Sequence, residues 1–218
     1  MKKINKIIIG TRNDGKFKEI CDLLPKNITK ISPRDLNLLS PDETGNTFEE
    51  NSKIKAEYFT KKTNLVAISD DSGLIIDLLS GAPGIYSSRW AGPTNDFNVA
   101  IKKVYNELKK VKFEWSKRKE VVARFISCLT LYWPNGKFVS STGIVDGRIS
   151  EIKKGSNGFG YDPIFIPSGY EKTFGELNPQ EKIKIDHRSK AFLKISNLFI
   201  NWFLKIGYQT LDRYLVYK

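Results

Sequence analysis

Two long strand-like segments around an Asn-Gly turn constrain the fold of this chain more than any other feature of its sequence. They cover residues 121–133 and 137–149 and are joined by Pro134-Asn135-Gly136. An Asn-Gly pair between two such segments is a strong signal for a tight β-hairpin, because both residues tolerate the left-handed backbone of the turn. The sequence therefore predicts one long antiparallel pair of strands.

The segments on either side of this hairpin alternate between short strands and helices. Apolar runs predict strands over residues 7–9, 65–69, 74–79 and 163–167. Helical spacing and capping signals predict helices over residues 16–24 and 96–110 and a helix that begins at the capping box of residues 47–50. Asn178-Pro179 predicts the start of another helix. The final helix carries an apolar stripe typical of a core-facing helix: Phe192, Ile195, Phe199, Trp202 and Phe203. Strand–helix units combined with a hairpin predict an α/β fold whose sheet contains both strand directions.

Composition limits the classes of protein to which the chain can belong. Its 218 residues include 36 Lys and Arg against 24 Asp and Glu, a formal charge of +12, and 40% are hydrophobic. This hydrophobic content excludes global disorder, and no apolar run reaches the roughly 20 residues that span a bilayer. One histidine and two cysteines, Cys21 and Cys128, exclude a disulfide framework and a zinc site of four His or Cys ligands. We expect a soluble protein of a reducing compartment. The charge of +12 is compatible with binding of nucleic acid or of a phosphorylated ligand, and a lysine-rich composition without such a partner is the alternative.

A polar turn, Thr11-Arg-Asn-Asp-Gly-Lys16, lies where the first strand gives way to a helix. Backbone N–H groups and the positive end of the helix dipole would face an anion there. Thr11 and Asn13 can donate hydrogen bonds to phosphate oxygens, and Lys16 can neutralise their charge. The spacing differs from that of a P-loop, so an ordinary helix cap is the alternative interpretation.

The acidic pair Asp70-Asp71, followed by Ser72-Gly73, is a stronger signal, and it lies between two predicted strands. Adjacent carboxylates beside an apolar strand need compensation, and oxygen ligands without histidines favour Mg²⁺ over zinc. In an extended backbone the two side chains point to opposite faces, so one could bind metal while the other supports the structure. A solvated turn is the alternative.

A second acidic pair, Asp42-Glu43, precedes the helix that begins at the capping box. It matters for function if it faces Asp71, because phosphoryl chemistry commonly draws carboxylates from separate segments around Mg²⁺. An exposed turn is the alternative for this pair. Asn51 and Lys55 on the following helix are spaced by four residues, which would also suit ordinary surface residues.

A glycine-rich segment and the single histidine complete the set of candidate residues. The glycines of Gly158-Phe-Gly-Tyr-Asp-Pro163 allow close approach of a flat ligand, on which Phe159 could stack. His187 and Arg188 follow Lys182 and form a donor-rich edge suited to carbonyl and phosphate oxygens. A turn with buried aromatics and a basic helix surface are the respective alternatives.

In this order and spacing, five segments resemble the inosine triphosphate pyrophosphatase family, whose members hydrolyse non-canonical purine nucleoside triphosphates such as ITP, dITP and XTP. The segments are Thr11–Lys16, Glu43–Asn51, Asp70–Leu74 with Gly81–Tyr86, Phe159–Pro163, and His187-Arg188. The resemblance extends from Ile7 to about Phe199. It implies a single domain over residues 1–218, with an elongated mixed central sheet, flanking helices and two lobes around a nucleotide-binding cleft.

The resemblance also implies roles for individual residues. Asp71 would be the catalytic carboxylate and a Mg²⁺ ligand, with Lys16 as a second catalytic residue. Asp42 aligns with the family's other metal-binding acid, although Glu43 is adjacent and one carbon longer. The substrate would be bound by Thr11, Arg12, Asn13, Asp14, Gly15, Lys16, Ser72, Phe159, Gly160, Tyr161, Asp162, Lys182, His187 and Arg188. Water would attack the α-phosphorus and release a nucleoside monophosphate and pyrophosphate.

Three features depart from the family pattern. Asp186 stands where serine is usual, Arg12 stands where bacterial members often have glycine, and residues 207–218 extend past the usual end. By resemblance we further expect a cytoplasmic homodimer that acts on a small nucleotide and binds neither membrane nor nucleic acid.

A nucleic-acid-binding module is the main alternative function. Residues 102–124 contain nine Lys and Arg against three Glu, as a phosphate-binding surface often does. No standard nucleic-acid motif occurs there, so a solvated helix and loop is the simpler interpretation. Further alternatives are a nucleotide pyrophosphatase with another base preference and an inactive nucleotide sensor.

Overall fold

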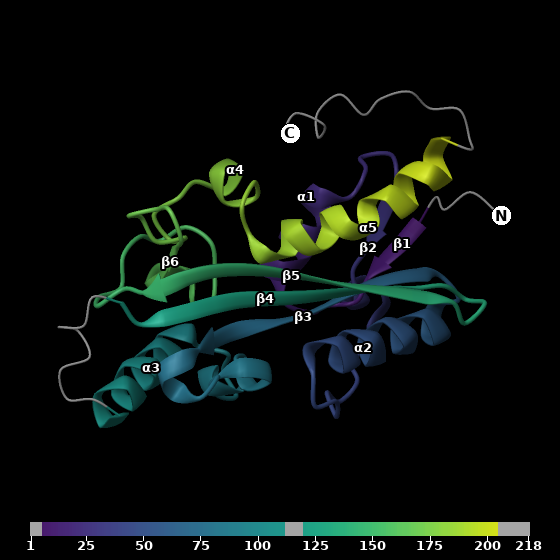
Figure 1. Ribbon diagram of the computed structural model, residues 1–218. Coiled ribbons are helices and arrows are strands. Elements are labelled where there is room, and N and C mark those ends of the chain that lie inside the picture. Colours follow the sequence, from purple (N-terminus) through teal and green to yellow (C-terminus); the bar gives the residue numbers. More distant parts are fainter. Residues whose placement is uncertain (1–5, 112–119, 205–218) are drawn as a thin grey trace.

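The hairpin predicted around Asn135-Gly136 is present in the computed structural model and forms its longest pair of strands (Figure 1). Strands β4 (Val122–Tyr132) and β5 (Phe138–Ile149) pair along their whole length, and Gly136 in the turn has a φ of 83°. The structure describes residues 6–111 and 120–204, with side chains up to residue 196. The side chains of the predicted core residues Phe199, Trp202 and Phe203, the tail 207–218 and part of the basic stretch 102–124 therefore lie outside what is described.

One six-stranded sheet runs through the molecule in the order β2-β1-β3-β4-β5-β6. The remaining strands are β1 (Lys6–Ile9), β2 (Thr29–Ile31), β3 (Val66–Ile76) and β6 (Phe165–Pro167). Strand β1 is parallel to both of its neighbours, whereas every pair from β3 to β6 is antiparallel. The prediction of an α/β fold with a mixed sheet is confirmed.

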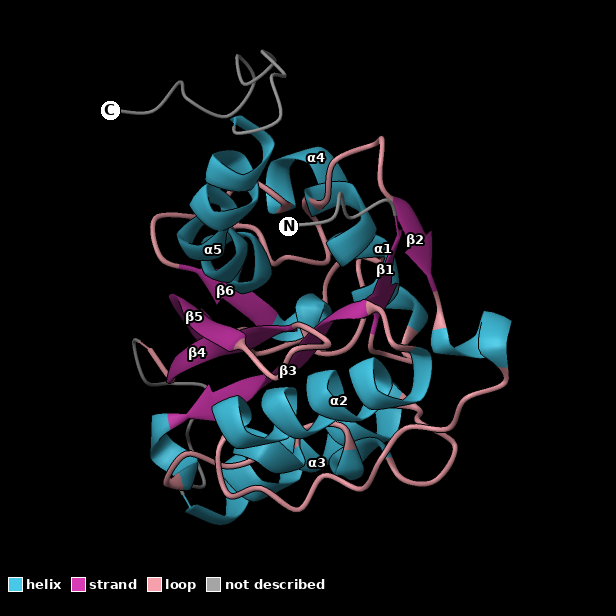
Figure 2. Ribbon diagram, turned by 90° about the vertical axis from the view of Figure 1, so that its right-hand side faces the viewer, coloured by secondary structure: helices cyan, strands magenta, loops and turns pink. Residues whose placement is uncertain are grey.

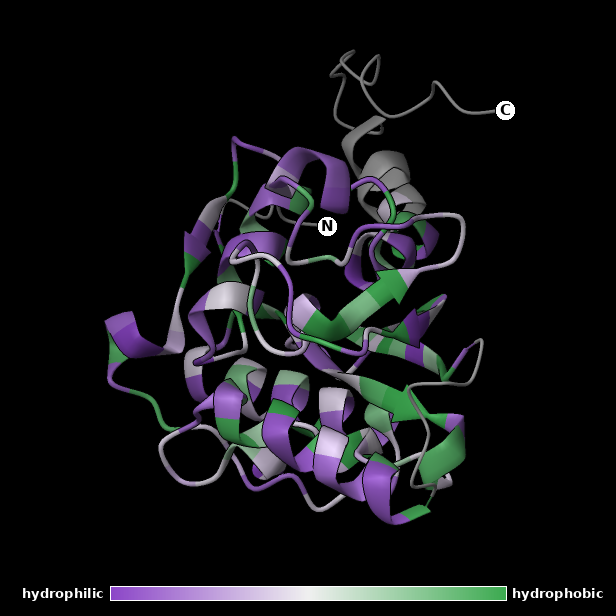
Figure 3. Ribbon diagram, turned by 90° about the vertical axis from the view of Figure 1, so that its left-hand side faces the viewer, coloured by the Kyte–Doolittle hydropathy of each residue, from purple (hydrophilic) through white to green (hydrophobic). Residues whose placement is uncertain are grey.

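Helices cover both faces of this sheet (Figures 1 and 2). Helices α1 (Asp14–Leu23) and α5 (His187–Leu204), with the short α4 (Pro179–Lys182), lie on one face, and α2 (Phe48–Thr63) and α3 (Phe97–Val111) lie on the other. The strands are largely apolar, and the polar segments are concentrated in the surrounding helices and loops (Figure 3). Within the described residues, no helix is both long and apolar enough to cross a membrane.

Strand β3 corrects one prediction. Instead of two strands around a polar turn, residues 66–76 form one continuous strand, in which Asp70, Asp71 and Ser72 pair with Leu129, Cys128 and Ser127 of β4. The sheet satisfies the backbone of the acidic pair, and side chains from other segments compensate its charge. The acidic pair therefore interrupts the apolar pattern of the sequence, but it does not interrupt the strand.

Two larger hydrophobic cores lie towards the two ends of the long strands, and a third, smaller one is formed by Ile8, Phe59 and Ala67. Val66 and Ile68 of β3 belong to a core with β1, α1 and α5, whereas Leu74 and Ile76 belong to a core with α3 and β6. The polar residues at positions 69–72 lie between the two larger cores. They are buried or half-buried, so this part of the sheet carries the polar chemistry of the molecule.

Candidate active site

The polar turn before α1 is held by its own side chains. Asn13 caps the helix by accepting a hydrogen bond from the Lys16 N–H (3.0 Å), and Thr11 accepts one from the Asn13 N–H (3.2 Å). The side chains of Arg12 and Asp14 are exposed, and Asp14 forms an ion pair with Arg34 (3.3 Å). The structure therefore turns Lys16 towards the sheet, but it does not bring the side chains of Arg12 and Asp14 there.

Asp70 organises one face of β3, and we call the residues around it the arginine cluster: Asp70, Lys16, Ser72, Ser127, Arg188 and Glu19. Lys16 lies 2.9 Å from Asp70, and Ser72 and Ser127 donate hydrogen bonds to its carboxylate (2.9 and 2.5 Å). Arg188 of α5 donates to Ser72 (2.8 Å), lies 3.3 Å from Asp70 and also pairs with Glu19 of α1. Side chains from α1, β4 and α5, which are far apart in the sequence, thus meet at the fully buried carboxylate of Asp70 on β3.

The glycine-rich segment adjoins the arginine cluster through Lys182. The Lys182 ammonium group bridges Glu19 (2.7 Å) and Asp162 (2.6 Å), and it lies 5.1 Å from the centre of the Phe159 ring. The same ring lies 5.6 Å from the Arg188 guanidinium. A Cβ atom at Gly15 would collide with this ring, so a glycine there lets Phe159 lie against the start of α1.

Electrostatics keep the arginine cluster charged and the histidine neutral. Burial alone would raise the pKa of Asp70, but Arg188 and Lys16 outweigh it and hold that pKa well below its ordinary value. Burial, reinforced by Arg188 and Lys182, holds the pKa of His187 well below its ordinary value. The His187 ring stacks on Phe125 with centroids 4.7 Å apart, and its buried Nδ1 has no hydrogen-bond partner. His187 can therefore act here as a neutral donor or acceptor.

Asp71 occupies the opposite face of β3, and we call Asp71, Lys55 and Glu43 the carboxylate cluster. The Lys55 ammonium group from α2 bridges Asp71 Oδ1 (2.7 Å) and Glu43 Oε1 (2.6 Å). Asp71 Oδ2 is buried without a hydrogen-bond partner. The expectation that Asp70 and Asp71 serve opposite faces is confirmed.

Burial raises the pKa of Asp71, and the nearby Glu43 adds to this effect, although Lys55 and Lys16 oppose it. Burial also acts on Glu43, but there Lys55 prevails, so the pKa of Glu43 lies below its ordinary value. The pair thus combines a firmly ionised carboxylate, Glu43, with one that takes up a proton more readily, Asp71. Such a difference between two neighbouring carboxylates is typical of sites that perform acid–base chemistry.

Glu43, and not Asp42, is the acid that the structure brings to Asp71. The Asp42 side chain is exposed, whereas the Glu43 side chain is 26% exposed and points to Lys55. Asn51 and Lys55 are not surface residues: both are buried, and Asn51 accepts a hydrogen bond from the Gly45 N–H (2.8 Å). Helical spacing placed them on one face, and the packing of α2 on the sheet turned that face inward.

The carboxylate cluster fits a divalent cation. Its oxygens are hard ligands, and Asp71 Oδ2 is an unpartnered buried acceptor. No group of three or more His, Cys, Asp and Glu is placed to hold a metal in residues 6–111 and 120–204. Proteins usually bind a Mg²⁺ ion that also contacts substrate phosphates through one or two carboxylates.

Glu19, Lys55 and Ser127 were missed as site residues by sequence reasoning. Glu19 lies one helical turn after Lys16, a spacing that could have placed it on the same face of α1. Ser127 of β4 lies opposite Ser72 of β3, a pairing that only the sheet reveals. For Lys55 the signal was its helical spacing from Asn51, which equally suits an exposed helix.

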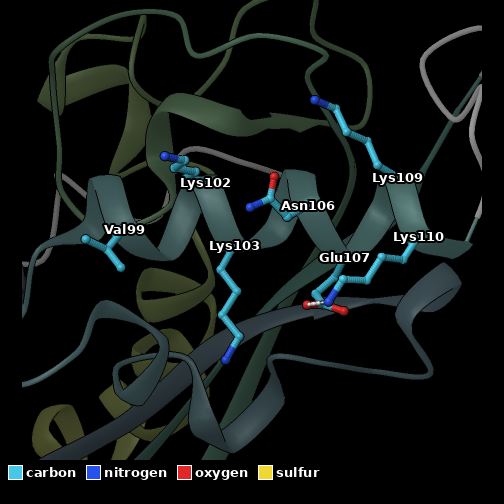
Figure 4. Close-up of a pocket in the computed structure, with 7 residues that line it drawn as sticks. All are labelled: Val99, Lys102, Lys103, Asn106, Glu107, Lys109 and Lys110. Carbon is cyan, nitrogen blue, oxygen red and sulfur yellow. Dashed lines mark hydrogen bonds and ion pairs between the residues drawn. The ribbon is translucent and has the colours of Figure 1, made fainter.

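A hollow on the surface of α3 lies apart from both clusters and shares no residue with them (Figure 4). Its lining includes Lys102, Lys103, Lys109 and Lys110, which are exposed parts of the basic stretch. Lys110 pairs with Glu107 (2.8 Å), and Lys103 lies over the Trp90 ring (4.5 Å). These lysines form a solvated helix face and take no part in the candidate site.

Comparison with known proteins places this geometry in a family. A model of the Ham1 family matches residues 7–198. The chain is 44% identical over 200 residues to a dITP/XTP pyrophosphatase of Agrobacterium fabrum, covering 86% of this chain and 92% of that protein. It is 43% identical over 190 residues to a dITP/XTP pyrophosphatase of Caulobacter vibrioides, covering 87% and 95%.

Solved structures agree with these sequence relationships. A HAM1 protein from Coxiella burnetii superposes with a TM-score of 0.79 at 35% identity, covering 90% of this chain and 98% of that one. The Ham1 protein of Staphylococcus aureus gives a TM-score of 0.76 at 33% identity, covering 91% and 99%. The resemblance drawn from the five sequence segments is confirmed. This chain belongs to the Ham1 family.

Proposed function

We propose that this protein hydrolyses non-canonical purine nucleoside triphosphates, such as ITP, dITP and XTP, to the nucleoside monophosphate and pyrophosphate. The observation that carries the proposal is the arrangement on β3: a carboxylate pair with one unpartnered oxygen on one face, and a cation-rich cluster beside an aromatic ring on the other. The proposal agrees with the names of the relatives, which are dITP/XTP pyrophosphatases.

Asp71 and Glu43 would hold Mg²⁺, which would lower the pKa of bound water and offset charge on the phosphates. The orphaned Asp71 Oδ2 is suited to accept a proton from the attacking water, because burial raises the pKa of this carboxyl group. Lys55 fixes the orientation of Asp71 by holding its other oxygen. Glu43 replaces Asp42 as the proposed second metal ligand.

The triphosphate would lie at the start of α1. The backbone N–H groups of the turn and the positive helix end attract anions there. Lys16, with Thr11 and Ser72, would contact phosphate oxygens, and its ammonium group would exchange Asp70 for phosphate as its partner. The positive charge of Lys16 would then offset charge on the leaving pyrophosphate.

The base would lie against Phe159, in the segment that also contains Gly160, Tyr161 and Asp162. Arg188, Lys182 and the backbone N–H groups only donate hydrogen bonds, so they suit the oxygen at C6 of hypoxanthine or xanthine. Adenine would present an amino group to another donor and leave both unpaired, which disfavours it. Asp70 and Glu19 hold the Arg188 guanidinium in position for this role.

Pyrophosphate release from ITP, dITP, XTP, ATP and GTP in the presence of Mg²⁺ tests the proposal. We expect ITP, dITP and XTP to be cleaved with the highest kcat/KM. Equal cleavage of ATP and ITP would contradict the assignment of the base contacts. Salt-dependent binding of DNA without any triphosphate hydrolysis would favour the nucleic-acid alternative instead.

Three further parts of the proposal follow from family resemblance. The protein acts as a single domain with a nucleotide-binding cleft between its lobes, forms a homodimer, and works in the cytoplasm. Size-exclusion chromatography with light scattering measures the oligomeric state directly.

A further inference from the structure

Arg89 links the two acidic segments of the carboxylate cluster, although it lies 46 residues from Glu43 in the sequence. It belongs to a short 3-10 helix, Arg89–Ala91, in the segment that follows β3. Its Nη2 donates a hydrogen bond to the main-chain carbonyl of Glu43 (3.0 Å). Its guanidinium also lies over the Tyr86 ring, 4.9 Å from the centroid, so its orientation is fixed by two contacts.

The segment that contains Arg89 is anchored to the strand that contains Asp71. Ser87 is buried and accepts a hydrogen bond from the Leu74 N–H of β3 (2.9 Å). Its hydroxyl donates to the Gly84 carbonyl (2.6 Å), and its own carbonyl accepts a hydrogen bond from Tyr161 (2.8 Å). Arg89 follows two residues later, so its backbone is tied to β3 near Asp71.

Glu43, by contrast, lies in a loop without regular structure. The ends of this loop are held locally: the Leu38 N–H donates to the Pro33 carbonyl (2.8 Å), and the Gly45 N–H donates to Asn51 (2.8 Å). Between these ends, Arg89 makes the only main-chain hydrogen bond to residues 39–44 that occurs in the described part of the chain.

We infer that Arg89 is the positioning residue of the metal site: it sets the distance of the Glu43 loop from Asp71 through a connection that starts on β3. Mg²⁺ binds its oxygen ligands at about 2.1 Å, so a displacement of the Glu43 loop by about one ångström would remove a ligand. Lys55 tolerates such a displacement better, because its ammonium group ends a flexible chain. The inference rests on the proposed function to the extent that Glu43 and Asp71 serve a cation.

The test compares Arg89→Ala and Arg89→Lys with wild type and with Arg148→Ala. Arg148 serves as the control, because it is an arginine that pairs with Glu171 at the surface (3.0 Å) and lies outside both clusters. Two measurements are made: the Mg²⁺ concentration that gives half-maximal pyrophosphate release at saturating ITP, and amide hydrogen exchange of residues 39–44 without nucleotide or metal.

For Arg89→Ala we expect the half-maximal Mg²⁺ concentration to rise about 3- to 10-fold, the effect of losing one such hydrogen bond. We also expect faster exchange in residues 39–44, with kcat at saturating Mg²⁺ and KM for ITP within about twofold of wild type. Arg89→Lys keeps the positive charge and a hydrogen-bond donor, so its half-maximal Mg²⁺ concentration and exchange rates should lie between those of wild type and Arg89→Ala. Arg148→Ala should match wild type in both measurements.

Two outcomes would overturn the inference. In the first, Arg89→Ala leaves both Mg²⁺ dependence and exchange unchanged; in the second, it raises KM for ITP with an unchanged Mg²⁺ requirement, as expected of a direct substrate contact. If Arg89→Ala does not fold, Arg89→Lys decides between the same outcomes. Failure of the proposed function gives a different result: wild type releases no pyrophosphate, while hydrogen exchange still reports whether Arg89 holds the loop.

Discussion

Asp70 and Asp71 are neighbours in β3, yet their carboxylates lie on opposite faces of the sheet, Asp70 at 2.9 Å from Lys16 and Asp71 at 2.7 Å from Lys55. The alternation of side chains along a strand separates them. Asp70 accepts hydrogen bonds and ion pairs on both oxygens, whereas Asp71 retains one unpartnered oxygen. One carboxylate therefore holds the site together, and the other is free to act on a ligand.

This difference predicts opposite effects of two adjacent substitutions. Asp71→Asn should reduce the rate of pyrophosphate release by about 10²- to 10⁴-fold, the range for loss of a general base, with little loss of stability because Lys55 keeps Glu43. Asp70→Asn should lower the free energy of unfolding by about 3–5 kcal/mol, because Arg188 and Lys16 lose a buried partner. Urea denaturation and pyrophosphate assays separate the two effects. An Asp71→Asn variant as active as wild type would remove Asp71 from the mechanism.

A second matched pair distinguishes the two acids of the loop. Glu43→Gln should raise the Mg²⁺ concentration needed for half-maximal activity at least about tenfold, because a neutral amide replaces a charged ligand. Asp42→Asn should leave this concentration unchanged, because the Asp42 side chain is exposed. Mg²⁺ titration of pyrophosphate release measures both. A raised Mg²⁺ requirement in Asp42→Asn, with none in Glu43→Gln, would show that Asp42 is the metal ligand.

Removing the bridging cation should shift the pH dependence of the reaction. In Lys55→Met the ammonium group that opposes the raised pKa of Asp71 is absent, so this pKa should rise further. A base must be deprotonated to act, so the acidic limb of the kcat/KM profile should move to higher pH. The profile is measured with ITP between pH 5 and 10. An acidic limb at the wild-type position would show that Lys55 does not control the ionisation of Asp71.

Asp186, the departure from the family's serine, should make stability depend on pH. Burial, with Glu19 nearby, raises the pKa of Asp186 from 3.8 to about 6, against the opposing charge of Arg188. The native state therefore binds this proton more tightly than the unfolded chain, so the contribution of Asp186 to stability is fully present below pH 3.8 and is lost as pH rises through about 6.

Asp186→Ser should remove this loss and still cap α5, since a serine hydroxyl can accept the Ser189 N–H as Asp186 does (2.6 Å). Relative to the variant, wild type should lose roughly 2–3 kcal/mol of unfolding free energy between pH 4 and 7.5, at about 1.4 kcal/mol per pKa unit. Urea denaturation at several pH values measures the difference. A constant difference across this range would contradict the prediction.

Local signals predicted most of the secondary structure. The Asn-Gly turn identified the hairpin, and Thr47, Asn178 and Pro179 marked the starts of α2 and α4, because capping and turn preferences act within a few residues. The continuous strand through Asp70 and Asp71 was not predicted. Its polar residues are stabilised by Lys16, Lys55 and Arg188, and no local pattern reports partners so distant along the chain.

By itself the sequence determined which chemistry the chain can perform: the order of acidic, basic and glycine-rich segments indicated a nucleotide pyrophosphatase, and alternation along a strand separated Asp70 from Asp71. Only the tertiary structure decided that Glu43 rather than Asp42 joins Asp71, that Lys55 is buried between them, and that the half-buried Glu19 pairs with Lys182. The reason is physical. Whether a charged side chain is buried and paired depends on contacts between helices and strands, and those contacts exist only after the chain has folded.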